Sequence, residues 1–206
     1  MYDEETGTYW SHMTGEALYG PDVGKHLEVR NLLHTTVAQI LEQDPETRVA
    51  LSDHENARGQ RGTLASILSR WTRLPDIFPA TLGGEDGRRP RMDLGLGLWQ
   101  GPRARYYATE TLTSGDRALL DSFAGRTVVV YIDPTEFIPM AQYVDADRVW
   151  WEGDVLHFSN GQYLDDGRTY GPDGERVGIE RPLQVFTRWY GFSQTFPETE
   201  VFGGGR

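Results

Sequence analysis

The side chains best suited to chemistry form a short cluster near the amino terminus. Trp10, Ser11 and His12 are consecutive, and Glu16 follows them in a glycine-containing stretch. A hydroxyl, an imidazole and a carboxylate this close together could polarise a bound ligand or hold a metal ion. The same residues also fit a structural role, in which Trp10 packs while Ser11 and His12 end a strand in solvent. Both interpretations stay open, and we treat all four residues as ligand-binding candidates.

A second candidate is the adjacent pair Trp150 and Trp151. Because successive side chains of a strand point to opposite faces, one of the two indole rings is expected to leave the core. An exposed indole beside acidic turns could stack on a sugar ring or contact a partner. The alternative is that the terminal helix or a neighbouring part of the chain covers it. The pair therefore predicts either a ligand-binding surface or an internal contact.

Other patterns of catalysis and cofactor binding do not occur in the sequence. The five histidines show none of the spacings that place two metal ligands on one helical face, and the chain has no cysteine. Copper or iron would suit imidazole and carboxylate ligands drawn from distant segments, but no pattern selects either metal. Acidic pairs such as Asp165 and Asp166 fit solvated turns, and there is no nucleophile elbow or phosphate-binding loop. The sequence therefore assigns no catalytic residue, no metal ligand and no cofactor.

Composition favours short strands over a helical bundle. The 206 residues include 24 glycines, 11 prolines and 12% aromatic residues, as is typical of short strands joined by tight turns. The net charge of −11 would repel the phosphates of nucleic acids and the surface of anionic membranes. No apolar run reaches the roughly 18 residues of a membrane span, and the amino terminus lacks an export signal. We therefore expect a soluble, β-rich chain that does not bind nucleic acid.

Two segments of the chain resemble each other. Residues 36–49 align without gaps on residues 188–201, and both contain the pattern P-E-T-x-V. Apolar residues three positions apart precede each proline, namely Val37 and Ile40 in the first segment and Trp189 and Phe192 in the second. This spacing places them on one helical face, so each copy is predicted to form a short helix, a stop at the proline and a strand.

A predicted hairpin lies upstream of each helix. Residues 3–10 and residues 165–170 both combine a turn of acidic residues and glycine with aromatic residues. In the second copy, strand-like segments come before the hairpin: residues 94–99, 103–108, 127–133, 140–144, 148–152 and 155–159. No such segments precede the first hairpin, so we predict that Met1 is an internal methionine of a longer protein and that the chain is truncated at its amino terminus.

The repeat suggests a two-unit organisation. A connecting helix is predicted for residues 63–74, and the polar loop at residues 83–91 is the predicted linker. The chain then divides into residues 1–84, the end of a first repeat, and residues 85–206, a complete second repeat. The expected fold class is α+β, predominantly β, with two related units of short antiparallel strands, each covered by a helix, about a pseudo-twofold axis. The incomplete first unit would expose apolar surface, which predicts self-association.

Most of the chain resembles a known family, through two strings in its first part and through residues 121–133 and 189–201. The strings M-Y-D-E-E-T-G-T-Y-W-S-H-M-T-G-E and T-T-V-A-Q-I-L-E-Q-D-P-E-T-R-V are similar to the later part of bacterial and archaeal proteins catalogued as domain of unknown function 3179. Members typically carry, upstream of this part, two cysteines in a C-P-x-C-like motif and a W-H-E-like motif, neither of which this chain contains. Many members look exported. The resemblance therefore implies that full-length relatives are extracytoplasmic and that chemistry carried by those motifs is lost here.

The leading hypothesis for function is a non-catalytic binding or structural module with an unidentified small-molecule ligand. One alternative is a fragment of an enzyme or metal-dependent redox protein, in which Trp10, Ser11, His12 and Glu16 form the rim of a site whose key groups lie upstream. Another alternative is a carbohydrate-binding module that uses Trp150 or Trp151.

Overall fold

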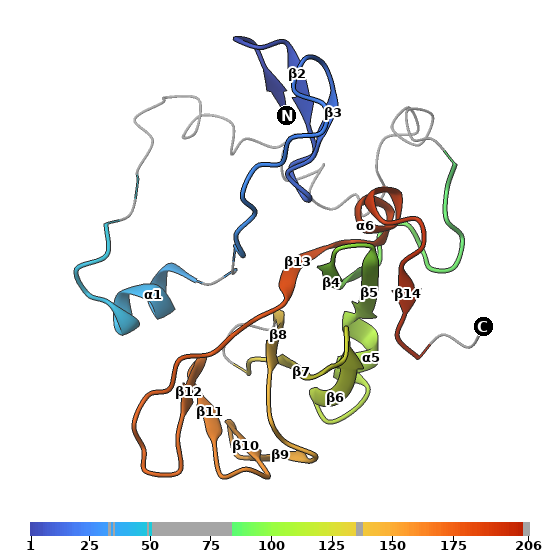
Figure 1. The fold of residues 1–206 in the computed structure, drawn as a ribbon. Helices are drawn as coiled ribbons and strands as arrows, with labels where there is room; N and C mark the ends of the chain where they lie inside the picture. The colour runs from blue at the N-terminus through green and yellow to red at the C-terminus, as the bar shows by residue number, and fades with distance from the viewer. Residues whose placement is uncertain (33, 35, 49, 51–83, 135–137, 204–206) are drawn as a thin grey trace, which may run out of the picture.

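The part of the chain that the structure describes folds into four small sheets and a few short helices (Figure 1). A computed structural model describes residues 1–32, 34, 36–48, 50, 84–134 and 138–203. The expected fold class, α+β and predominantly β, is confirmed by the order of the elements. Among the helices of these residues, none has both the length and the apolar character of a membrane span. The helix predicted at residues 63–74 lies outside the described residues.

The amino-terminal sheet is a three-stranded antiparallel meander. Its strands are β1 (Tyr2–Asp3), β2 (Thr8–Trp10) and β3 (Ala17–Tyr19), and the helix α1 (Val37–Gln43) follows. The Asp3 carboxylate accepts hydrogen bonds from the Glu5 backbone N–H and the Thr6 hydroxyl, which closes the turn between β1 and β2. The hairpin predicted at residues 3–10 is therefore confirmed.

The central sheet has the strand order β13-β4-β5-β14. Its strands are β4 (Leu94–Gln100), β5 (Arg103–Ala108), β13 (Leu183–Arg188) and β14 (Glu200–Val201), of which β14 pairs parallel to β5. The helix α6 (Trp189–Thr195) covers one face, where Trp189 and Phe192 are fully buried against Tyr106. A Cβ atom at Gly97 would lie 2.1 Å from the Phe192 ring. Glycine on β4 therefore lets α6 approach the sheet this closely.

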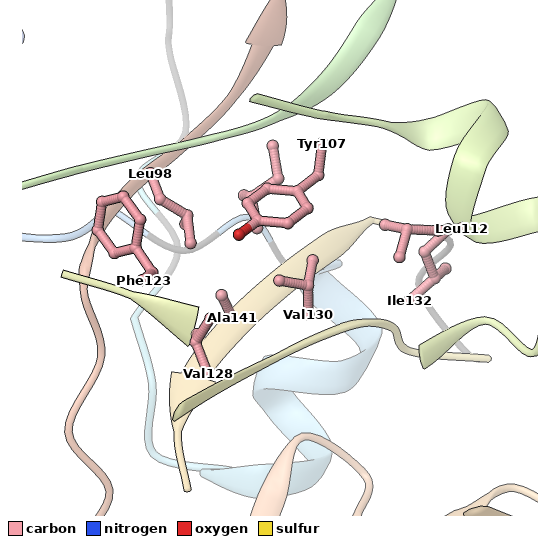
Figure 2. Packing of buried hydrophobic residues seen from close by; sticks show 9 residues of the cluster. Leu98, Tyr107, Leu112, Phe123, Val128, Val130, Ile132 and Ala141 are labelled. Carbon is pink, nitrogen blue, oxygen red and sulfur yellow. The ribbon is translucent and has the colours of Figure 1, made fainter. Parts of the chain in front are cut away.

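A second sheet packs against the opposite face of the central sheet. It contains β6 (Ala118–Phe123), β7 (Arg126–Ile132) and β8 (Pro139–Tyr143), and the short helix α5 (Thr109–Thr113) connects β5 to it. Figure 2 shows the core between the two sheets, where Leu98 and Tyr107 meet Val128 and Val130 of β7. Because β7 is covered on both faces, its residues 128–132, V-V-V-Y-I, form a continuous apolar run.

The outer sheet forms the last layer. Its antiparallel strands β9 (Val149–Glu152), β10 (Val155–Phe158), β11 (Tyr163–Asp165) and β12 (Arg168–Tyr170) follow one another in chain order. Leu156 and Leu164 are buried on its inner face, in one cluster with Val129 and Tyr131 of β7. The hairpin predicted at residues 165–170 is confirmed, and the six strands predicted upstream match β4, β5, β7, β8, β9 and β10 to within one residue at each end.

Tight turns fix the register of the outer sheet. Gly153 has a φ of 63° between β9 and β10. Asp166 and Gly167 have φ values of 45° and 69° between β11 and β12. Two-residue turns with positive φ match the twist of the strands that they join. The side chains of these strands are therefore held in defined cross-strand pairs.

The two predicted copies share local hydrogen bonds at their helices. At the end of the first helix, the backbone N–H of Asp44 donates to the carbonyl oxygen of Ile40, and the N–H of Thr47 donates to that of Asp44. At the end of the second helix, the N–H of Phe196 donates to the carbonyl oxygen of Phe192, and the N–H of Thr199 donates to that of Phe196. These positions correspond in the gapless alignment of residues 36–49 with residues 188–201. The local backbone geometry is therefore the same in both copies.

The surroundings of the two helices differ. Val37 of α1 is 56% exposed, and within the described residues no sheet packs against α1 as the central sheet packs against α6. The exposed large hydrophobic side chains of the described residues are concentrated between positions 1 and 41. A second helix-covered unit is therefore not observed in the described ranges. The internal repeat and self-association stay predictions.

The described part of the predicted linker is bound to α6. The Trp189 indole N–H donates to the Asp86 carbonyl oxygen (2.8 Å), and the Arg88 guanidinium donates to the carbonyl oxygens of Pro197 (3.1 Å) and Thr199 (2.6 Å). The hydrogen bond from the Arg88 side chain lowers the pKa of Asp86 below its ordinary value. This loop contributes to the packing of the second unit, and a domain division near residue 85 stays a prediction.

Candidate functional site

Aromatic rings form an unbroken row across the outer sheet. The strand register places Trp150 opposite His157, His157 opposite Tyr163, and Tyr163 opposite Tyr170. Successive ring centroids lie 5.7, 5.9 and 5.2 Å apart, and the ring planes are inclined by 17°, 33° and 17°. These four side chains occupy the face opposite the buried Leu156 and Leu164, and we call them the aromatic row.

Trp150 is the end of the row on the edge strand β9. Its side chain is 37% exposed, and its indole N–H donates to the Glu152 carboxylate at 2.8 Å. The other carboxylate oxygen of Glu152 lies 3.8 Å from Nε2 of His157. The Arg148 guanidinium lies over the indole ring, 5.4 Å from its centroid. Trp150 is therefore an exposed ring surrounded by both acidic and basic groups.

A hollow of about 500 Å³ opens beside Trp150. Residues 115–118, between α5 and β6, line one side, and residues 149–151 of β9 line the other. Asp116 and Arg117 therefore lie on the wall of the hollow opposite Trp150 and Trp151. This volume lies within the range of about 300–1,000 Å³ that is usual for small-molecule sites. We call this feature the Trp150 hollow.

Arg117 has an unusual backbone conformation at the wall of the hollow. Its φ of 57° lies in the left-handed region, which is disfavoured for a residue with a Cβ atom. The guanidinium lies 5.0 Å from the ring centroid of Trp151, and the indole N–H of Trp151 is buried without an acceptor among the described residues. Backbone strain of this kind often marks ligand-binding segments. Arg117 is therefore a candidate contact residue.

The pair Trp150 and Trp151 divides between the two faces, as the sequence predicts. Trp150 is exposed, whereas Trp151 packs against the buried cluster that contains Leu156. Both nevertheless line the Trp150 hollow because it lies at the edge of the sheet. The ligand-binding role of the pair stays a prediction.

The amino-terminal candidates form a tight turn. The Ser11 hydroxyl accepts a hydrogen bond from the Thr14 N–H at 3.1 Å, and the Ser11 N–H donates to the Glu16 carbonyl oxygen at 2.8 Å. Trp10 ends β2, while the His12 and Glu16 side chains are exposed. No hydrogen bond joins the side chains of Ser11, His12 and Glu16 in the described structure. The turn brings these residues together through their backbone, and their ligand-binding role stays a prediction.

A second hollow, of about 550 Å³, lies between β8 and residues 177–180. There the Arg126 guanidinium lies 3.6 Å from the Tyr143 ring centroid and pairs with Glu180 at 2.7 Å. The pairing lowers the pKa of Glu180, and burial raises the pKa of Tyr143. The aromatic face at this hollow is thus covered closely by a cation, which makes it the weaker candidate.

The described residues contain no group of three or more acidic or histidine side chains placed to hold a metal ion.

Part of the candidate site can be predicted from the sequence. The sequence-based prediction includes Trp150 and Trp151 but not Arg117, Tyr163 or Tyr170. The two-residue turns predict the pairing of Tyr163 with Tyr170, because their length sets the strand register. Arg117 reaches the tryptophans across a contact between β6 and β9, and no local pattern predicts such a contact.

Comparison with known proteins gives one match. A family model described as "Protein of unknown function (DUF3179)" matches residues 1–199. No curated protein and no solved structure matches the chain significantly. The matched range covers nearly the whole sequence and agrees with the resemblance of its amino-terminal strings. The chain therefore belongs to the DUF3179 family of proteins of unknown function.

Proposed function

We propose that this chain is a non-catalytic carbohydrate-binding module whose sugar site is the Trp150 hollow. The observation that carries the proposal is the exposed Trp150 at a hollow that is also lined by Asp116 and Arg117. Sugars present apolar C–H faces and hydroxyl groups together. An indole ring matches the first, and Asp116 and Arg117 can accept from and donate to the second.

Arg148 does not close the site against a ligand. At 5.4 Å from the ring centroid it makes an exposed cation–π contact, of a kind worth about 0.5–1 kcal/mol. A sugar that stacks on the indole would replace this contact with larger apolar burial, while the guanidinium turns to a hydroxyl group. Arg148 would then act as a further hydrogen-bond donor.

The charges favour a neutral glycan. The chain carries a net charge of −11, which repels polyanions at a distance. Near the hollow, Asp116 and Glu152 accompany Arg117 and Arg148, so the local charges are mixed and nearly balanced. Such a surface has no net preference for sulfate or uronate groups.

The proposal is tested by glycan binding to the whole chain. We expect at least one neutral glycan to bind on an array, and calorimetry should show that Trp150→Ala abolishes this binding. Leu94→Ala is the matched control, because Leu94 is the other exposed large hydrophobic side chain in the described part of residues 84–203. Silence of all glycans, or equal losses in both variants, would contradict the proposal.

A further inference from the structure

The aromatic row begins at Trp150, which lines the Trp150 hollow, and runs from there across the outer sheet. Each of its members is the direct cross-strand partner of the next, so the row crosses all four strands of the outer sheet. Neighbouring strands lie about 4.8 Å apart, which gives the row a length of about 15 Å. A ligand much larger than one sugar ring could therefore contact it.

The rings of the row partly cover one another, and the two tyrosines carry hydroxyl groups. Trp150 stacks on His157 and Tyr163 stacks on Tyr170, while the planes of His157 and Tyr163 are tilted by 33°, so each ring covers part of the face of the next. The hydroxyl groups of Tyr163 and Tyr170 have no hydrogen-bond partner among the described residues, and both side chains are only partly buried. Stacking alone would not require these hydroxyls. They are available to a ligand lying along the row.

A line in which three of the four residues are charged runs beside the aromatic row. Two positions from the row along each strand, the same face carries Glu152 on β9, Val155 on β10, Asp165 on β11 and Arg168 on β12, and Asp165 is the register partner of Arg168. Carboxylates and a guanidinium can bind the hydroxyl groups of a chain of sugars. The inner face of the same sheet carries leucine and phenylalanine side chains instead.

We infer that the ligand is a linear, neutral polysaccharide that lies across the four strands of the outer sheet. This inference rests on the proposed function. One sugar ring occupies the Trp150 hollow, and the following rings lie over His157, Tyr163 and Tyr170. Their hydroxyl groups bond the tyrosine hydroxyls and the adjacent charged line. Affinity therefore increases with the number of linked sugars until the row is filled.

The experiment compares oligosaccharides of increasing length on the whole chain. Calorimetry would use the monomer to the hexamer of β-1,4-linked glucose, β-1,4-linked N-acetylglucosamine and α-1,4-linked glucose. We expect the affinity to rise over the first few sugars. The double variant Tyr163→Phe, Tyr170→Phe keeps the stacked rings and removes only the hydroxyls. It should lose roughly three- to tenfold in affinity per hydroxyl for long oligomers and leave the shortest bound ligand unaffected.

A matched control is Tyr19→Phe, because Tyr19 is 72% exposed on the amino-terminal sheet, outside the row. This variant should bind every oligomer as the unmodified chain does. If short and long oligomers bind equally through Trp150, the polysaccharide inference is overturned while the proposed function stands. If the double tyrosine variant keeps the full gain with length, the row does not carry the ligand and the inference is likewise overturned. If no oligomer binds, both fail.

Discussion

The side-chain amide of Asn31 forms hydrogen bonds with the backbone on both sides of Leu183, as a neighbouring strand would. Its nitrogen donates to the carbonyl oxygen of Pro182 and its oxygen accepts from the N–H of Gln184, both at 2.9 Å. In a parallel ladder, one residue of a strand bonds the two residues that flank its partner in this way. Extended from residues 36–49, the gapless alignment of the two copies assigns Asn31 to Leu183. The same alignment matches His34 with Phe186, and the ring centroids of these two residues lie 6.0 Å apart. Both contacts therefore join positions that the predicted repeat matches, and the repeat itself stays a prediction.

Replacing Asn31 by alanine should loosen this contact. Two hydrogen bonds to part-buried backbone are lost, each worth about 0.5–1.5 kcal/mol, so the free energy of unfolding should fall by about 1–3 kcal/mol. Denaturant unfolding measures the loss, and hydrogen exchange at the Gln184 amide should accelerate. Asn160→Ala is the control, since the side-chain hydrogen bonds of Asn160 within the described residues stay inside an exposed turn, with Gln162 as the partner. Unchanged exchange at Gln184 in Asn31→Ala would show that the two segments do not meet.

Because α6 packs closely on β4, one methyl group added at Gly97 should lower the stability of the fold strongly. In Gly97→Ala the new Cβ atom would lie 2.1 Å from the buried Phe192 ring, so α6 must shift. Overpacking of this kind costs about 1–3 kcal/mol or more, and the thermal unfolding midpoint should fall clearly. Gly87→Ala is the matched control, because a Cβ atom at Gly87 would meet nothing within 4 Å. Equal midpoints for the two variants would argue against this packing.

The loop before β4 should respond to acid through Asp86. The bond from Arg88 lowers the pKa of Asp86 in the folded chain, so this contribution to stability is present above the ordinary value of 3.8 and is lost as the pH falls below it. Asp86→Asn removes the carboxylate. The unfolding midpoint of this variant should lie below that of the unmodified chain at neutral pH. The difference should shrink as the pH falls below the ordinary value, and a difference independent of pH would contradict the assignment.

Sequence patterns predicted the strands and turns that local residue types alone specify. The run V-V-V-Y-I of β7 indicates a strand covered on both faces, and the turn residues Asp166 and Gly167 indicate a tight hairpin. β6 was missed because Asp121 and Ser122 interrupt its apolar residues. In the structure, the Asp121 carboxylate accepts hydrogen bonds from Arg105 and from the Tyr107 hydroxyl. Those partners come from another strand, so only the folded chain explains why an acidic residue belongs in β6.

The candidate site likewise has one part that sequence patterns predict and another part that depends on long-range contacts. Alternation along β9 predicts that one tryptophan leaves the core, and turn length predicts the aromatic pairs that extend from it. The place of Arg117 depends on how the loop after α5 meets the edge of the outer sheet, which is a long-range contact. A positive φ at arginine is also not predictable from residue preference, since glycine or asparagine usually occupies such positions.

The backbone conformation of Arg117 allows a test that separates stability from binding. In Arg117→Gly the left-handed conformation becomes favourable, which can gain up to about 1 kcal/mol. The cation–π contact with Trp151 is lost, at a cost of about 0.5–1 kcal/mol. These effects nearly cancel, so the free energy of unfolding should change little. Binding of the glycan in the Trp150 hollow should nevertheless weaken, because a hydrogen-bond donor is removed from its wall.

Ala124→Gly supplies the matched comparison for this test. Ala124 also has a positive φ, of 53°, but it lies in the turn between β6 and β7, and neither the Trp150 hollow nor the aromatic row includes it. Relief of the same backbone strain should raise the free energy of unfolding without altering glycan affinity. The gain should stay below about 1 kcal/mol, because the Ala124 methyl group, which packs against the core between the two sheets, is lost. Calorimetry and denaturant unfolding of both variants measure the two quantities separately. If Arg117→Gly gains stability as Ala124→Gly does and keeps full affinity, Arg117 contacts neither Trp151 nor the ligand, and the strain at Arg117 has no role in binding.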